Sequence, residues 1–290
     1  MPLTPYQFFV ASLQLMLLLV GAWGLARILG VPATRARVFE RSRLVPWSIT
    51  GPEVALLLVT FMLFGIVGQG VLVSLFREAL DSSPEKTGLQ VAVYGFGLHG
   101  FPVLAWPLFH VVRRALHSDY GVEPPVAIVS TPRRLSWAKV LAHAVVTLLL
   151  ILPVLTLASA LWTLLLRQTG LPDAPQELIE IFGAVQSPWV FTAMLLVACV
   201  VAPLNEELIF RRVIFRFCRQ RFGRGFALLV SGVLFGALHG NWAGFFPLAL
   251  LGVGLAIAYE RTGDLRVPIL AHGLFNLNTI LIVLSGLAEA

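Results

Sequence analysis

Charged residues are scarce in this chain of 290 residues. They make up 12% of the sequence, whereas 58% of the residues are hydrophobic and the mean hydropathy is +0.86. Because a soluble globular protein carries about 25% charged residues, this chain has too few to cover a surface exposed to water. A soluble protein is therefore excluded, and we expect lipid to be the solvent for much of the chain.

Cysteine is also rare, with only Cys199 and Cys218. Two cysteines exclude a zinc site built from cysteine ligands and do not imply a disulfide framework. The His-Glu-x-x-His signature of soluble zinc proteases is absent as well. The net charge of +6 would suit nucleic acid or an anionic membrane surface, but its distribution favours the lipid bilayer, and we expect no nucleic-acid partner.

Eight stretches approach the roughly 20 apolar residues that a membrane-spanning helix needs. The first is too long for the core of a signal peptide and has no basic segment before it, so we expect a retained helix. The sequence therefore predicts an all-α fold, a polytopic transmembrane bundle of about eight helices. The stretches are roughly residues 7–29, 54–76, 90–112, 137–166, 189–210, 225–240, 243–260 and 267–287.

Positive charge alternates along the linkers between these stretches. Of the 21 Lys and Arg residues, all except Arg77, Lys86 and Arg167 lie in or at the edges of the first, third, fifth and seventh linkers. Basic residues accumulate on the cytoplasmic side of membrane proteins. We therefore predict an integral, multi-pass protein whose two termini both face away from the cytoplasm, in the cell membrane if the source is bacterial.

The chain divides into two parts by its polar residues. Residues 1–188 hold four plain helices and a proline-rich cytoplasmic connector, residues 118–132, and end in an acidic loop, residues 171–188. Residues 189–290 concentrate the ionisable side chains inside hydrophobic stretches. Such groups cost about 3 kcal/mol each at mid-bilayer, so they indicate a functional core in this second part.

Two adjacent carboxylates mark the first of three polar motifs, residues 205–211 with the sequence NEELIFR. Glu207 and Arg211 are four residues apart, so they share a helix face and can pair. Glu206 points about 100° away and lacks that partner, and an unpaired carboxylate in a low-dielectric site suits a general base. The alternative is a cluster of charges at a helix end that reaches the lipid headgroups.

The second motif is residues 235–239, FGALH, and it ends at His239. A stripe of Gly232, Gly236 and Gly240 predicts close approach of a neighbouring helix beside this histidine. The alternative is a histidine that bonds a helix carbonyl or lies at the outer interface.

The third motif is residues 272–276, HGLFN, in which His272 and Asn276 share one helix face. A buried asparagine needs hydrogen-bond partners, so a helix–helix pair is the alternative interpretation.

Together these side chains could bind a water, deprotonate it and stabilise an oxyanion. One Glu and two His side chains, with one coordination position left open for water, would also suit a hydrolytic zinc site. His239 and His272 are the candidate ligands. The two histidines lie at different depths in their stretches, so we expect them to converge only if a helix is tilted or a cavity penetrates deeply.

The three motifs in this order resemble the CPBP family, the CAAX proteases and bacteriocin-processing proteins, also called the Abi or Ras-converting CAAX endopeptidase family. The resemblance covers roughly residues 189–287. It implies that Glu206 activates water and that Glu207 and Arg211 support its helix. It also implies that His239, His272 and Asn276 complete the site by binding water or metal and the oxyanion. A divalent metal, zinc, and a metal-free glutamate mechanism both remain open.

We therefore expect an intramembrane endopeptidase that hydrolyses a peptide bond of a membrane-associated substrate, CAAX-like or other. A non-enzymatic scaffold or immunity-type binding protein is the alternative, and a transporter is a third class that the absence of a repeat disfavours. One further histidine, His99, lies in a glycine-rich run of the third stretch. It could reach the site, and we interpret it as a helix-packing residue.

Overall fold

The computed structural model describes residues 3–39, 42–47, 49–119, 134–173 and 177–287. Within these ranges the secondary structure is helical, as predicted. In the first part of the chain, three of the predicted transmembrane stretches form uninterrupted α-helices. These are α1 (Pro5–Gly30), α3 (Gly51–Leu75) and α7 (Trp137–Thr169). Short helices α2 (Pro32–Phe39), α4 (Arg77–Ser82) and α8 (Glu177–Ala184) lie in the connections.

Two of the long helices are interrupted by π-helical turns. The third stretch is formed by α5 (Lys86–Gly95), the π-helical turn η1 (Phe96–Gly100) and α6 (Pro102–Asp119). The fifth is a continuous run of α9, η2, α10, η3 and α11. Their bounds are α9 (Pro188–Leu196), η2 (Val197–Val201), α10 (Ala202–Glu207), η3 (Leu208–Phe215) and α11 (Arg216–Phe222).

The last three stretches are α12 (Arg224–Leu238), α13 (Trp242–Thr262) and α14 (Arg266–Leu284). Seven helical runs in the described residues are long and apolar enough to cross a membrane, and α12, at 15 residues, is shorter. The predicted eight stretches are thus all helices, and the prediction of a polytopic helical bundle is confirmed.

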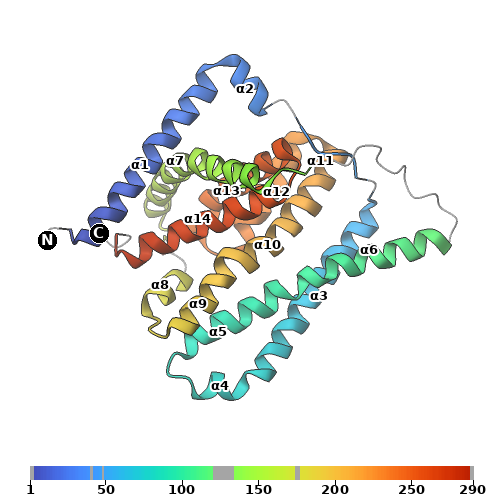
Figure 1. Cartoon of the computed structure of the whole chain (residues 1–290), viewed down its shortest axis with the longest axis horizontal. Helices are drawn as coiled ribbons and strands as arrows, with labels where there is room; N and C mark the ends of the chain where they lie inside the picture. The colour runs from blue at the N-terminus through green and yellow to red at the C-terminus, as the bar shows by residue number, and fades with distance from the viewer. Residues whose placement is uncertain (1–2, 40–41, 48, 120–133, 174–176, 288–290) are drawn as a thin grey trace.

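The first part of α1 and the last part of α14 lie close together near the two termini, and the two helices run in opposite directions (Figure 1). The amides of Gln14 in α1 and Asn278 in α14 exchange hydrogen bonds of 2.8 and 3.3 Å, and Gln7 lies beside Gly286. A chain that begins and ends on the same side crosses the bilayer an even number of times. We therefore predict that the short α12 is also a crossing, which would give eight.

The fifth helix extends beyond the predicted end at residue 210 and reaches Phe222. Glu206 therefore lies in the middle of this helix and not near its end, where the predicted bounds of residues 189–210 placed it. Gly223, with φ of 86°, turns the chain sharply into α12. Glu206 lies 17 residues before this turn and His239 lies 16 residues after it, so both reach about 25 Å from the turn.

Glycines bring α12 against α13, as predicted. A Cβ added at Gly236 would lie 2.4 Å from the carbonyl oxygen of Phe245, and one at Gly232 would lie 2.7 Å from that of Ala249. Gly240 does not belong to this contact: its φ is 65°, it lies two residues beyond the last residue of α12, and an added Cβ would meet no atom within 4 Å. Its role is to end the helix after His239.

A buried carboxylate joins α12 and α13 at the end of the pair that lies away from Gly240. Glu260 near the end of α13 is 1% exposed and forms ion pairs with Arg219 of α11 and Arg224 of α12, at 2.5 and 2.7 Å. The backbone N–H of Arg43, in the segment before α3, donates to the Glu260 carbonyl. These contacts fix α11, α12 and α13 at one end, and so set the depth at which their polar side chains meet.

Candidate functional site

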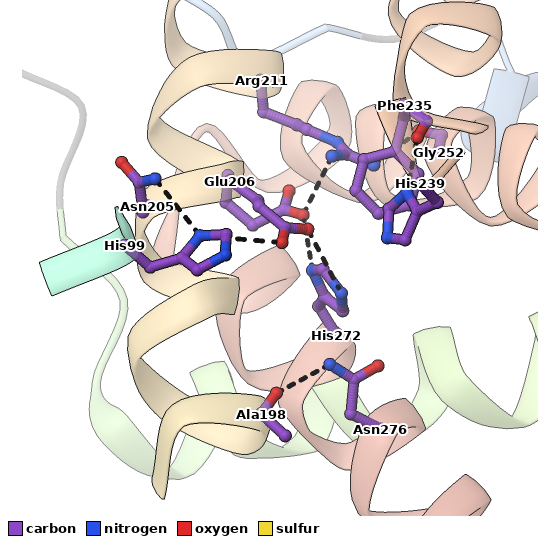
Figure 2. A network of polar contacts seen from close by, with 11 residues as sticks. His99, Ala198, Asn205, Glu206, Arg211, Phe235, His239, Gly252, His272 and Asn276 are labelled. Carbon is purple, nitrogen blue, oxygen red and sulfur yellow. Dashed lines mark hydrogen bonds and ion pairs between the residues drawn. The ribbon is translucent and has the colours of Figure 1, made fainter. Parts of the chain in front are cut away.

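Glu206 and Glu207 belong to α10, which lies between the π-helical turns η2 and η3. Their side chains diverge, as the helical rotation predicts. Glu207 turns inward and is fully buried, and the Glu206 side chain is 16% exposed. Figure 2 shows the Glu206 carboxylate between the rings of His99 and His272.

The predicted ion pair between Glu207 and Arg211 is present and fully buried. Arg211 Nη1 lies 2.9 Å from Glu207 Oε1, and Arg211 Nη2 donates to the carbonyl of Gly252 in α13 at 3.1 Å. The guanidinium also lies 4.5 Å from the centroid of the Phe235 ring. The Arg211 charge is thus matched by a carboxylate, a carbonyl and an aromatic face, as burial of an ion requires.

His272 links the two carboxylates. Its Nδ1 lies 3.0 Å from Glu207 Oε1, and its Nε2 lies 3.8 Å from Glu206 Oε2. An ionised carboxylate only accepts hydrogen bonds, so Nδ1 carries a proton and donates it to Glu207. In neutral His272 the lone pair is then on Nε2 and faces Glu206, and a water molecule can donate to it.

One oxygen of Glu206 has no hydrogen-bond partner among the described residues. This atom, Oε2, is buried, and it is the oxygen that faces His272 Nε2. A buried carboxylate oxygen without a partner costs free energy unless water or a substrate group bonds it. Glu206 Oε2 and His272 Nε2 are close enough that one water or substrate group could hydrogen-bond to both.

His239 lies beside the same aromatic ring. Its Nδ1 is 2.7 Å from the Phe235 carbonyl, so Nδ1 donates, and its ring centroid lies 4.8 Å from that of Phe235. His272 also lies beside Phe235, at 5.4 Å between ring centroids. Phe235 thus packs against both histidine rings. His239 lies at the same depth in the bundle as Glu206 because the turn at Gly223 places the two residues at similar distances along neighbouring helices.

Asn276 is placed by a backbone group that the helix leaves unbonded. In η2 the N–H of Ala202 donates to the carbonyl of Val197, and Pro203 has no N–H. The carbonyl of Ala198 therefore lacks a donor within its helix, and Asn276 Nδ2 donates to it at 2.7 Å. Figure 2 shows this amide on the far side of His272 from Glu206. A role for its second N–H at the oxyanion stays a prediction.

His99 reaches Glu206, as the sequence allowed, and it also packs against the neighbouring fifth helix. Its Nδ1 is 4.0 Å from Glu206 Oε1 and 3.4 Å from Asn205 Nδ2. The signal that could have found it is the glycine-rich run of residues 95–100, which permits close approach of neighbouring helices. Asn205, which is 4% exposed, was part of the first motif but had no predicted role.

The donors do not converge as a metal site. His239 and His272 both have Nδ1 bonded to an acceptor, an arrangement that also orients metal-bound histidines. Among the described residues, however, no group of three or more His, Cys, Asp or Glu side chains is placed to hold a metal ion. The described residues as they lie here do not fit a zinc ion, one of the two alternatives that the sequence left open, so we derive no step through a metal.

Fold and site together define a helical, multi-pass membrane protein with a cluster of carboxylates and histidines buried inside its helical bundle. Residues 188–278 match the family described as "Type II CAAX prenyl endopeptidase Rce1-like". The resemblance indicated by the three polar motifs is thereby confirmed over the part of the chain that carries them.

Two curated proteins are similar to part of the chain. The "Putative membrane peptidase YdiL" of Bacillus subtilis (strain 168) is 34% identical over 101 residues, which are 35% of this chain and 39% of that protein. The "Uncharacterized 24.3 kDa protein" of Escherichia coli is 31% identical over 114 residues, 38% of this chain and 52% of that protein. The chain thus spans about half or less of the length of these relatives. No solved structure shows significant similarity to it.

Proposed function

We propose that this protein is an intramembrane endopeptidase that hydrolyses a peptide bond of a membrane-associated peptide or protein, CAAX-like or other. The observation that carries the proposal is the Glu206 carboxylate, whose Oε2 is buried, has no partner among the described residues, and faces the Nε2 of His272. The match of residues 188–278 to a family of membrane endopeptidases supports the same conclusion.

In this mechanism Glu206 is the general base. A water held between Glu206 Oε2 and His272 Nε2 donates one proton to each acceptor, so its lone pair is free to attack a substrate carbonyl. Glu206 takes a proton as the oxygen–carbon bond forms. When the carbon–nitrogen bond breaks, Glu206 returns that proton to the leaving amine. The products are a carboxylic acid and an amine, and the base is regenerated.

The oxyanion of the tetrahedral intermediate needs a donor. Because Nδ1 of His239 donates to the Phe235 carbonyl, His239 can donate from Nε2 only when its ring carries both protons. We assign this donor role to His239 and the role of holding water to His272. The Glu207–Arg211 pair fixes the proton of His272 on Nδ1, and Asn276 holds α14 against η2.

Glu206→Gln tests the proposal, because it keeps the size of the side chain and removes the base. We expect cleavage to fall by about 10² to 10⁴, the usual contribution of a general base. The measurement is amino-terminal proteomics on membranes from cells that express either protein, with new N-termini quantified by mass spectrometry. The matched control is Glu78→Gln on the exposed helix α4, which should cleave like the parent protein.

The same experiment separates a protease from a binding scaffold. A protease variant without its base should still co-purify with uncut substrate, whereas a binding protein should show no difference in new N-termini between the two cell lines. Equal cleavage by the Glu206→Gln protein would overturn the assignment of the base and favour the scaffold.

Removal of metal gives a second test of the mechanism. Since no three described side chains gather at one point as metal ligands, we expect purified protein to keep its cleavage activity after dialysis against a chelator. Loss of activity that added zinc restores would contradict the metal-free mechanism and return His239 and His272 to the role of ligands.

A further inference from the structure

His99 comes from the first part of the chain, outside the residues that match the endopeptidase family. Its Nδ1 lies 4.0 Å from Glu206 Oε1, nearly the distance that separates His272 Nε2 from Glu206 Oε2, 3.8 Å. The carboxylate therefore lies between two imidazoles, one facing each oxygen (Figure 2). Of these two imidazoles, only that of His272 belongs to the three sequence motifs.

The turn that carries His99 is held by close backbone packing. A Cβ added at Gly97 would lie 2.4 Å from Gln69 Cα, and one at Gly68 would lie 2.3 Å from the ring of Phe101, so η1 packs directly on α3. On its other side, a Cβ at Gly95 would lie 2.4 Å from Val197 in η2. The π-helical turn is wedged between two helices, which fixes where the His99 ring can lie.

Asn205, the residue before Glu206, contacts the His99 ring. Its Nδ2 lies 3.4 Å from His99 Nδ1, and its Oδ1 is buried without a hydrogen-bond partner among the described residues. The amide can therefore donate to an unprotonated Nδ1 or, after rotation, accept from a protonated one. A protonated Nδ1 would also face the Glu206 carboxylate. Asn205 thus holds the ring beside Glu206 in either state, and the ring attracts Glu206 Oε1 when Nδ1 is protonated.

We propose that His99 is a positioning residue of the site: it restrains the Oε1 side of Glu206, so that Oε2 faces the reacting water and His272. This role rests on the proposed function of Glu206. It gives the first part of the chain a role in the chemistry, because the π-helical turn η1, which packs on α3, supplies a further polar side chain beside Glu206. A misplacement of about 1 Å can cost 10²-fold in rate, so this restraint has a measurable effect.

The test compares three variants of the full chain. His99→Leu removes the restraint, His99→Gln keeps an N–H near Glu206, and His110→Leu is the control from the same helical run, where His110 packs on Trp106 and Phe109. We expect His99→Leu to lower kcat by about 10- to 100-fold with little change in KM, and His99→Gln to recover part of the loss. The assay uses a peptide whose cleavage is first identified by comparison with Glu206→Gln.

A second measurement does not depend on cleavage. Infrared difference spectra of the purified protein in lipid contain the carboxyl band of Glu206, identified as the band that Glu206→Gln removes. His99→Leu should shift the frequency of that band, and His110→Leu should not. An unshifted band together with parental kcat in His99→Leu would overturn the proposal while leaving the protease assignment intact. Failure of Glu206→Gln to reduce cleavage would instead refute the protease assignment.

Discussion

Two identical neighbouring residues have opposite surroundings in this protein. Glu207 is fully buried, and its charge is balanced by Arg211 and by the Nδ1 proton of His272. Glu206, one residue earlier, has a side chain that is 16% exposed, and its Oε2 faces the Nε2 side of the same histidine. The helical rotation of about 100° between them separates a structural carboxylate from the one that we propose as the base. Environment, rather than residue type, thus assigns the two roles.

Arg211→Ala should be strongly destabilising, because it leaves the Glu207 carboxylate buried without its counter-charge. Removing one partner of a buried pair typically costs about 3–5 kcal/mol. We expect less folded protein in the membrane and a lower thermal midpoint in detergent. Arg221→Ala is the matched control, since Arg221 is exposed at the end of α11. A normal thermal midpoint for Arg211→Ala would show that the pair does not hold this helix.

At the scale of helices, the π-helical turns account for the positions of two polar side chains. The turn η1 carries His99, and η2 with Pro203 leaves the Ala198 carbonyl for Asn276. Turns of this kind often occur at functional sites, since they alter the regular hydrogen bonding of a helix. Here the altered bonding gives α14 a specific partner on the fifth helix, which fixes the register between His272 and Glu207.

Gly273→Ala should disturb this register. A Cβ at Gly273 would lie 2.2 Å from the carbonyl oxygen of Cys199, a backbone atom that cannot move independently of its helix. We expect α14 to move away from η2, with a destabilisation of about 1–3 kcal/mol and loss of activity as the His272–Glu207 contact lengthens. Thermal unfolding and the cleavage assay measure both effects.

Gly225→Ala is the control for this substitution. Gly225 lies in the first turn of α12, and an added Cβ there would meet no atom within 4 Å. Alanine at this position should keep activity and leave stability unchanged or slightly raised, because alanine favours a helix over glycine. Equal behaviour of the two alanine variants would argue against tight contact between α14 and η2.

At the scale of the whole molecule, the two parts of the chain share hydrophobic cores. One core combines Leu57, Phe61 and Phe109 with Leu208 and Val213 of η3. The helix α7 packs against both α13 and α14. The division at residue 188 stays a prediction, and the described contacts join its two sides closely.

Both termini should face away from the cytoplasm. The antiparallel contact of α1 with α14 places the two ends on one side, and the alternation of basic residues predicts which side this is. Reporter fusions after Ala290 and within residues 120–130 measure the orientation. The C-terminal fusion should report from outside the cytoplasm and the internal fusion from within it. A cytoplasmic signal from the C-terminal fusion would contradict the orientation.

The sequence alone determined the class of protein and most of the polar residues at the site. Hydropathy over about 20 residues depends only on the local chain, so all eight helical stretches could be predicted. The Glu207–Arg211 pair and the shared face of His272 and Asn276 follow from spacing of four residues on one helix. The resemblance of the three motifs to an endopeptidase family, confirmed over residues 188–278, follows from the same short patterns.

The tertiary structure alone decided which residues meet. His99 and Asn205 are 106 residues apart in sequence, and no local pattern predicts their contact. The position of Glu206 in mid-helix depends on the length of α11 and the turn at Gly223, and the bond of Asn276 depends on a π-helical turn in another helix. Hydropathy and helical spacing describe one segment at a time, whereas the site forms where five segments pack together.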